Sequence, residues 1–375
     1  MSDFASLLNS FKQDASAAST TSTKRSSQQN PPSRKRPYAQ VTTPSRHSTP
    51  HFPSIHSNRR SDIDFELNFL GIGAQKAGTT WLHKLLQKCD DIGLPQDKKE
   101  VHFWDWHHRK GFDWYTRQFG YHSKDTSTSS SSPTALPVKY GEITPCYAVL
   151  PEATIAEIYN CFPNLKIIFV ARDLVDRAWS AMIMELRDQT MGLNAGEFAS
   201  EINDHDKKKH KLNAAQQRRL EQQSSPSSQP DSYYIDRLRS TTHDSRSNYA
   251  KHLRNWYKHF PSSSILLIDY TEIDSNPRNV LLKVLMHIGI KEGTAKQFVN
   301  NLKNDDVDQR VNAATVVSDS SNNLPSSSHQ QLAQRPLLKK QMERNLQRYA
   351  RDFNNMLKSY GYDWTLEDYD LNKER

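Results

Sequence analysis

The chain has 375 residues, 35% of them hydrophobic, and a net charge of +8, which allows one large domain or two small ones. Nine Lys or Arg against two Asp or Glu give residues 1–60 a net charge of +7, so the nearly neutral remainder is not marked as a nucleic-acid-binding protein. No run approaches the roughly 18 apolar residues of a membrane helix, and three cysteines without metal-ligand spacing favour a reducing compartment over a disulfide framework.

The N-terminal segment, residues 1–60, is predicted to be a disordered basic tail. It is rich in Ser, Thr, Pro and Gln and too polar to bury a core. Its first residues, MSDFASLLNSFKQ, include acids and lack a continuous apolar stretch, so they make a poor secretory signal. We therefore expect a soluble intracellular protein, cytoplasmic in the simplest case. The basic cluster SRKRP (33–37) leaves nuclear import through the tail open, and a Golgi-lumen location also stays open.

Three internal segments interrupt the body of the chain. Residues 123–134, 203–232 and 312–332 consist largely of Ser, Gln, Asn and charged residues, a composition typical of low-complexity insertions. The remaining residues are few enough for one core. We therefore expect a single domain over residues 61–370 that carries these inserts.

The body alternates short apolar strands with amphipathic helices. This alternation predicts an α/β fold, a P-loop-like parallel sheet with helices on both faces. Ligands of such sheets bind beyond the carboxyl ends of the strands. In chain order, the predicted elements are a strand over 65–73, a helix over 79–89, a strand over 165–172, helices over 176–186 and 247–260, a strand over 264–273 and a helix over 276–290.

The stretch GIGAQKAGTTWL (71–82) joins the first strand to its helix. Gly73 and Gly78 have the spacing of a Walker phosphate loop, but Thr79 occupies the position of the Walker lysine and Lys76 lies inside the loop. Such a turn points several backbone N–H groups at one anion, and the helix dipole favours negative charge there. The pattern predicts an anion-binding loop. The alternative is a tight turn closed by a threonine N-cap.

The second strand ends in Arg172, where a Walker B strand would end in an acid that helps to hold Mg²⁺. Because an arginine would repel a metal ion, we predict no metal and a site that neutralises anions with protein cations alone. Asp173 is expected either to orient Arg172 or to cap the helix that follows.

Several of these segments resemble the sulfotransferase family. GAQKAGTTWL resembles its 5′-phosphosulfate loop, and ARDLVDRAWSAMIMEL (171–186) resembles its 3′-phosphate segment. KKEVHFWDW (98–106) and YGEITPCY (140–147) are closest in style to the Golgi-type branch, notably the heparan sulfate glucosaminyl 3-O-sulfotransferases. Residues 246–277 resemble the family's long helix, strand and turn, and residues 335–364 resemble its closing helix.

The resemblance implies 3′-phosphoadenosine-5′-phosphosulfate (PAPS) as the donor and an in-line transfer of its sulfuryl group to an acceptor hydroxyl or amine. It also implies that Lys76 stabilises the leaving phosphate, whereas Arg172 and Ser180 bind the 3′-phosphate. The full set of donor-binding residues carried over from the family is Gln75, Lys76, Ala77, Gly78, Thr79, Thr80, Trp81, Arg172 and Ser180.

The acceptor requires a general base. Glu100 aligns with the catalytic glutamate of the Golgi-type branch, and His102 is the alternative by its intrinsic pKa. We expect Glu100 to be the base and His102 a supporting donor, so the predicted catalytic residues are these two and Lys76. In a plainer interpretation, Glu100 is only a solvated partner of Lys98 or Lys99.

The acceptor side is less defined by the sequence. Glu142, Thr144 and Tyr147 are expected to shape the cleft, and Asp105 is a candidate acceptor contact. Ile143 replaces a lysine that helps to hold substrate in many Golgi-type relatives, so an acidic polysaccharide is only one of several acceptor classes, and carbohydrate in general remains a candidate partner. Aromatic side chains that would either stack on an acceptor or pack beneath the active-site loop are Trp104, Trp106, Phe112, Trp114 and Tyr115.

Two other functions remain open. One is a nucleotide-dependent phosphotransferase, which the position of Lys76 and the missing Walker acid disfavour. The other is a catalytically inactive binding protein of sulfotransferase fold that acts through its basic tail. The family's late glycine- and basic-rich loop, which covers the donor, is hard to recognise in residues 310–336.

Overall fold

The computed structural model describes residues 65–121, 139–190, 229–307 and 328–369. The predicted tail and the first insert lie outside these ranges. The other two inserts lie outside them except at their ends, where helices begin at Asp231 and Ser328. The second of these helices is anchored by Leu332, which is buried. Within the ranges described, no helix is long and apolar enough to cross a membrane.

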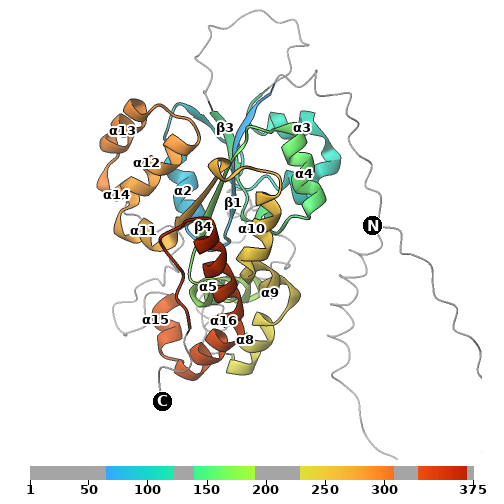
Figure 1. Cartoon of the computed structure of the whole chain (residues 1–375), viewed down its shortest axis with the longest axis vertical. Coiled ribbons are helices and arrows are strands. Elements are labelled where there is room, and N and C mark those ends of the chain that lie inside the picture. The colour runs from blue at the N-terminus through green and yellow to red at the C-terminus, as the bar shows by residue number, and fades with distance from the viewer. Residues whose placement is uncertain (1–64, 122–138, 191–228, 308–327, 370–375) are drawn as a thin grey trace, which may run out of the picture. The chain divides into compact units, whose positions relative to one another are not determined.

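Five parallel strands form one sheet in the order β2-β3-β1-β4-β5 (Figure 1). The inner strand β1 is buried along its whole length, as its largely apolar sequence, interrupted only by Asn68, predicts for a parallel strand covered on both faces. The predicted parallel α/β fold is therefore confirmed. The strands are β1 (Leu67–Gly73), β2 (Ile92–Gly93), β3 (Lys139–Ile143), β4 (Lys166–Ala171) and β5 (Ile265–Asp269).

Helices cover both faces of the sheet. In Figure 1, α2 and α11 to α14 lie on one side of the strands, and α3, α4 and α10 lie on the other. The remaining helices gather beyond the carboxyl ends of the strands. The helices are α2 (Thr79–Leu86), α3 (Phe112–Arg117), α4 (Glu152–Cys161), α5 (Leu174–Thr190), α8 (Asp231–Leu238), α9 (Thr241–Ser247), α10 (Tyr249–Tyr257), α11 (Tyr270–Ser275), α12 (Pro277–His287), α13 (Glu292–Asn301), α14 (Asn304–Val307), α15 (Ser328–Ala333) and α16 (Pro336–Ser359).

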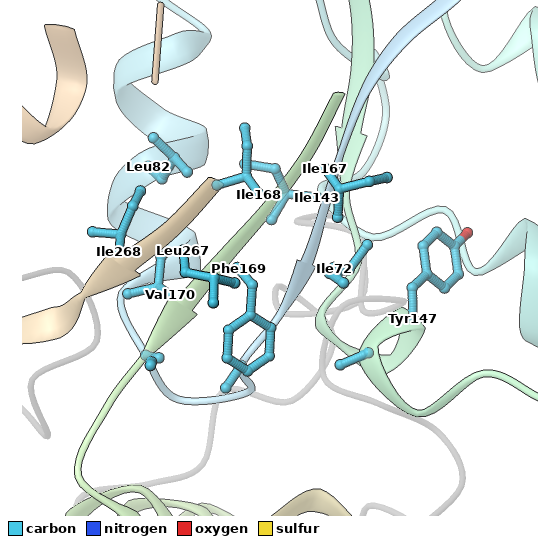
Figure 2. Close-up of a cluster of buried hydrophobic side chains, with 14 of the residues drawn as sticks. Ile72, Leu82, Ile143, Tyr147, Ile167, Ile168, Phe169, Val170, Leu267 and Ile268 are labelled. Carbon is cyan, nitrogen blue, oxygen red and sulfur yellow. The ribbon is translucent and has the colours of Figure 1, made fainter. Parts of the chain in front are cut away.

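The hydrophobic core lies between the sheet and these helices. Figure 2 shows Ile72 of β1, Phe169 of β4 and Ile268 of β5 gathered with Leu82 of α2, and all four are buried. Removing this apolar surface from water is the main favourable term that holds the helices on the sheet.

The strand order points to the end of β1 as the place where a ligand would bind. From β1 the chain runs to β2 and β3 on one side and then to β4 and β5 on the other. Ligands of such sheets bind where the strand order reverses, outside the carboxyl ends of the strands. At that edge lie Gly73 at the end of β1, Thr144 after β3 and Arg172 after β4.

Two strand predictions were incomplete. The third predicted strand, over residues 264–273, ends at Asp269, because the carboxylate of Asp269 accepts a hydrogen bond from the Thr271 N–H at 3.0 Å and caps α11. The strands β2 and β3 were not predicted from the apolar pattern, since β2 has two residues and β3, KYGEI, carries both a lysine and a glutamate.

Candidate active site

The loop between β1 and α2 has the backbone of an anion site. Lys76 and Gly78 both adopt left-handed conformations, with φ of 67° and 78°. A Cβ on Gly78 would lie 3.0 Å from Ile273 Cδ1, so glycine suits both the conformation and the close approach. Gly78 itself is the N-cap of α2, without a side-chain cap or an acidic residue in the first turn. The alternative of a threonine N-cap is therefore wrong, and the helix start is suited to an anion.

Two predicted donor-binding residues, Arg172 and Lys76, meet at this loop, and a third lies on the neighbouring helix α5. Arg172 donates from Nη1 to the Lys76 carbonyl at 2.8 Å, and its guanidinium lies 4.8 Å from the centre of the Tyr270 ring. Lys76 Nζ lies 3.8 Å from Met184 Sδ, which places the lysine against α5. Ser180 precedes Met184 by one helical turn and therefore shares that face of α5. The Arg172 Nε is buried and has no hydrogen-bond partner among the residues described.

The other loop residues divide into core and site. Ala77 and Trp81 are buried, and Trp81 Nε1 donates to the Val307 carbonyl at 2.8 Å. Their side chains belong to the core, so only their backbone N–H groups are suited to a donor. Thr79 turns its hydroxyl toward the acceptor side, whereas Thr80 is half-buried.

Asp173 has the second of its two expected roles. Its Oδ1 accepts a hydrogen bond from the Asp176 N–H at 2.9 Å, at the start of α5, and its Oδ2 accepts one from the Tyr369 hydroxyl at 2.5 Å. These contacts support a role in capping the helix.

The predicted base lies between two cationic groups. Lys99 Nζ donates to Glu100 Oε1 at 2.8 Å, and His102 Nε2 lies 3.4 Å from Glu100 Oε2. The same Lys99 Nζ donates to Thr79 Oγ1 at 3.2 Å, which ties the base to the start of α2. Glu100 therefore does pair with a neighbouring lysine, but its side chain is only 18% exposed and it also faces a histidine. The picture of a freely solvated ion pair is wrong.

This arrangement fixes the charges of the two candidate bases. Burial alone would raise the pKa of Glu100, but the contact with His102 and the Lys99 ammonium lower that pKa to about 2. Burial alone would lower the pKa of His102, but Asp105 and Glu100 raise that pKa to about 9. At neutral pH the pair is therefore a carboxylate and an imidazolium, and only the carboxylate can accept a proton.

His102 is held from two more sides. Its backbone is left-handed, with φ of 54°, and it precedes the π-helical turn η2 (Phe103–His107). Its Nδ1 lies 2.8 Å from Asp105 Oδ2, and its ring stacks on Trp106 with centroids 3.9 Å apart. Asp105 is thus primarily a partner of His102. Only Trp106 among the candidate aromatic residues is well exposed, at 39%.

The other candidate aromatic residues pack in or against the core. Trp104 and Tyr115 are buried, and Phe112 and Trp114 are partly buried against the core cluster. For these four, packing beneath the active-site segment is the better interpretation. For Trp106, a contact with the acceptor remains a prediction.

A buried carboxylate positions the whole acceptor segment. Glu142 is fully buried and accepts hydrogen bonds from the hydroxyls of Tyr115 at 2.7 Å, Thr144 at 2.7 Å and Tyr147 at 3.1 Å, and from the Val101 N–H at 3.2 Å. The Tyr147 hydroxyl also accepts from the backbone N–H of Phe103 at 2.8 Å. Since Val101 and Phe103 flank His102, this cluster fixes the backbone that carries the predicted catalytic groups.

Sequence reasoning missed Arg246 as a site residue. Its Nη1 donates to Gln75 Oε1 at 2.7 Å, and its Nη2 lies 3.6 Å from Cys146 Sγ. It therefore links the donor loop to the acceptor side from the end of α9. The one available signal was its place at the head of the RSNY segment that resembles the family, because an arginine in a polar stretch has no distinctive pattern of its own.

Cys146 also completes a group of metal-ligand type. One ligand atom each of His102, Asp105 and Cys146 lie within 4.8 Å of one another. The existing contacts compete with a metal, since Asp105 pairs with His102 and a guanidinium lies beside the thiol. Burial raises the pKa of Cys146 to about 11, so the thiol form predominates. The absence of a metal from the reaction remains a prediction.

Together these features define a class of protein: a parallel α/β enzyme with an anion-binding loop at its switch point and an ionised carboxylate tied to that loop through a lysine. The comparison with protein families agrees with this class. Residues 68–356 match the family model of the sulfotransferase domain, and the chain belongs to that family.

Individual relatives share little sequence with this chain or match only part of it. The chain is 33% identical over 113 residues to the membrane-associated sulfotransferase kil1 of Dictyostelium discoideum, a match that covers 30% of this chain and 22% of that protein. The structure of a sulfotransferase from Alicyclobacillus acidocaldarius is 17% identical, with a TM-score of 0.46, over 80% of this chain and 98% of that one. The mouse sulfotransferase SULT7A1 complexed with PAP is 15% identical, with a TM-score of 0.34, over 79% and 88%.

Family membership carries a reaction type. Sulfotransferase-domain enzymes transfer a sulfuryl group from PAPS to an acceptor. The residues of this chain suit such a donor. The uncapped helix start and the Lys76 side chain suit a 5′-phosphosulfate, and the buried Arg172 Nε without a hydrogen-bond partner in the described ranges suits a further anionic group.

Proposed function

We propose that this protein transfers the sulfuryl group of PAPS to a hydroxyl or amine, with Glu100 as the general base and Lys76 stabilising the leaving phosphate. One observation carries the proposal. The lysine that contacts Glu100 at 2.8 Å also contacts Thr79 of the anion loop at 3.2 Å. A base and an anion-binding loop within reach of one ammonium group would hold acceptor and donor near each other, which supports an in-line transfer.

The donor side follows from its cations. Lys76, the backbone N–H groups of residues 77–80 and the dipole of α2 would bind the 5′-phosphosulfate. Arg172 and Ser180 would bind the 3′-phosphate, because an arginine with an unused donor is well suited to phosphate oxygens. PAPS supplies the sulfuryl group and a good leaving group.

The chemical step balances without a further reactant. Glu100 accepts the proton of the acceptor O–H or N–H as the acceptor atom forms its bond to sulfur. The bond between sulfur and the bridging phosphate oxygen breaks, and Lys76 compensates the charge that develops on that oxygen. His102, as an imidazolium held by Asp105, holds Glu100 in position. Since His102 is already protonated near neutral pH, it is a poor candidate for the base.

The acceptor class is inferred from the acceptor side of the site, which is formed by residues 98–106 and 140–147. The segments 98–106 and 140–147 resemble the Golgi-type branch, and Trp106 offers an exposed aromatic face beside His102, which suits a sugar ring. Ile143 is fully buried and cannot supply the cation that many relatives have there. Arg246, beside Gln75 and Cys146, is the group that would take over this role toward an acidic acceptor.

Ligand-induced stabilisation tests the donor assignment. We expect 3′-phosphoadenosine-5′-phosphate (PAP) to raise the Tm more than ATP does at equal concentration, because only PAP offers a 3′-phosphate to Arg172 and Ser180. Adenosine 5′-phosphate, which lacks that phosphate, is the matched control. Equal shifts with all three nucleotides would contradict the assignment, and a Mg²⁺-dependent preference for ATP would favour a phosphotransferase.

A substitution at the base tests the catalytic assignment. Extracts supplied with radiolabelled PAPS, followed by mass spectrometry of the labelled products, identify an acceptor. We expect Glu100→Gln to abolish sulfation of that acceptor and to preserve the Tm shift caused by PAP. Full activity in this variant would transfer the role of base to His102, and absence of sulfation by the wild-type protein would favour an inactive binding protein.

A further inference from the structure

The Lys99 side chain is the contact between the donor loop and the predicted base. Its ammonium group donates both to the hydroxyl of Thr79 and to the carboxylate of Glu100, at 3.2 and 2.8 Å. The side chain is only 16% exposed, so these contacts are sheltered from solvent screening. An ammonium ion held at both places will respond to any new charge that arrives at either of them.

The same contacts make Glu100 a poor base in this structure. Lys99 engages Oε1, and His102 lies against Oε2. A general base works best when its pKa is near the working pH, whereas two cationic neighbours stabilise the carboxylate and lower the pKa of Glu100 to about 2. The carboxylate is thus well positioned but holds too little affinity for a proton.

We propose that Lys99 couples donor binding to activation of the base: it holds Glu100 while the anion loop lacks PAPS and turns to the phosphosulfate when PAPS binds. Phosphosulfate oxygens bring full negative charge to the place where Lys99 now meets only a hydroxyl. A lysine can redirect its three N–H donors by rotation of its flexible stem. Glu100 then loses one of its two cationic partners. This inference rests on the proposed function and deepens it.

Several other groups face Glu100 or its partners. From α2, His83 lies near Lys99 and Glu100, and burial, followed by the charge of Lys99, lowers the pKa of His83 to about 4, so this ring is neutral near neutral pH. The remaining groups are His102 and Asp105 of the acceptor segment, Cys146 of η4 (Pro145–Val149) and Arg246 of α9. Lys99 joins the loop to Glu100 by hydrogen bonds to both.

Proton uptake on PAP binding tests this coupling without turnover. Loss of a cation within hydrogen-bond distance raises the pKa of a carboxyl group by about 1–3 units. Calorimetric titration with PAP in two buffers of different ionisation enthalpy, at pH ~4, should therefore reveal proton uptake by Glu100 in the wild-type protein, added to the proton release of the PAP phosphates that all variants share. Lys99→Met should lose most of this uptake, because the pKa of Glu100 is already raised in its free form. Lys99→Arg should retain most of it.

Two variants identify the groups involved. Glu100→Gln should remove the Lys99-dependent part of the uptake, since it has no carboxyl group to protonate. Lys98→Met, one position away, changes an ammonium group that lies 5.8 Å from the centre of the Trp114 ring, and it should behave as the wild type. Equal uptake by the wild type, Lys99→Met and Glu100→Gln would overturn the inference. In that case PAP would still bind and only the inference about Lys99 would fail. If PAP did not bind at all, the proposed function would be contradicted instead.

The pH dependence of turnover gives a second readout. For the wild type, the acid limb of kcat should lie about 1–3 pH units above that of kcat/KM for PAPS, because only the donor complex has the raised pKa. In Lys99→Met the two limbs should coincide, whereas in Lys98→Met they should stay apart. A purely structural role for Lys99 would lower the rate without closing this gap, and a gap that persists in Lys99→Met would overturn the inference.

Discussion

The donor side and the acceptor side of the site are built in different ways. On the donor side, the anion loop follows β1 directly and Arg172 follows β4, so adjacent strands bring local motifs together. On the acceptor side, the segment with Glu100 and His102 is an irregular turn. Its Val101 N–H donates a hydrogen bond to Glu142, which lies 41 positions further along the chain. A short motif is enough to specify the first side, whereas the second depends on buried contacts between distant residues.

The two glutamates of the acceptor side show the same contrast on a smaller scale. Glu100 meets two cationic groups, which lower its pKa. Glu142 meets three hydroxyls and a backbone N–H, and burial raises its pKa although these donors oppose the rise. Charged partners make the first a chemical group that responds to ligands, and neutral partners make the second a fixed structural support.

The largest effect on kcat is expected from removal of the lysine charge in the donor loop. Lys76→Met keeps the length of the side chain but leaves the developing charge on the leaving phosphate without its cation, so kcat should fall by about 10²–10³, as for other preorganised oxyanion donors. Transfer of label from PAPS to the identified acceptor measures the loss. Lys84→Met, an exposed lysine on α2, the helix that follows the loop, is the control. Unchanged kcat in Lys76→Met would remove this lysine from the mechanism.

The second-largest effect is expected from Glu142→Gln, which weakens the hydrogen bonds that hold the acceptor side but not those of the donor side. In Glu142→Gln, an amide with two N–H groups faces donors that a carboxylate satisfied. The free energy of unfolding should fall by about 1–3 kcal/mol. Because displacement of catalytic groups by about 1 Å costs on the order of 10² in rate, kcat should fall by about that factor.

Whether the donor and acceptor sides are separate units depends on whether Glu142→Gln still binds PAP. PAP should still raise the Tm of Glu142→Gln by nearly the wild-type amount, because the donor side has its own supports. Glu152→Gln, which alters an exposed carboxylate paired with Lys258, is the control and should leave the free energy of unfolding nearly unchanged. Joint loss of PAP binding and sulfation in Glu142→Gln would show that the two sides are not separate units.

A smaller effect is expected from pH through His102. Its folded-state pKa of about 9 lies above the ordinary value of 6.5, so its contribution to stability is complete below pH 6.5 and is lost as the pH rises through 9. If the imidazolium supports Glu100, kcat should fall about tenfold per unit above that pH. Asp105→Asn removes one carboxylate and should move this limb down by about 1–3 pH units. A limb that stays in place would exclude His102 as its source.

The difference between the two sides also explains what the sequence could predict. The strand, glycines and lysine of the loop are contiguous, so the parallel fold and an anion-binding loop were predicted from the pattern, whereas the donor itself was implied by the resemblance to the family. The Glu100 segment was found only through its resemblance to the family. Lys99 and Arg246 gave no signal of their own, because their roles depend on partners 20 and 171 positions away. Likewise, nothing in KYGEI distinguishes a buried Glu142 from a solvent-exposed one.

The smallest effect probes Trp106, the well-exposed one among the candidate aromatic residues. Trp106 presents one ring face to His102, and 39% of the residue is exposed, so a ring of the acceptor can stack on it. Aromatic contacts are worth about 0.5–1.5 kcal/mol; Trp106→Ala should therefore raise the KM for the acceptor about 2–10-fold and leave the PAP-induced Tm shift unchanged. Trp106→Phe keeps a smaller ring, so its KM for the acceptor should lie between the values of the wild type and of Trp106→Ala. A fall in kcat at constant KM would instead mean that Trp106 serves to position His102, and the acceptor would then bind elsewhere on the acceptor side.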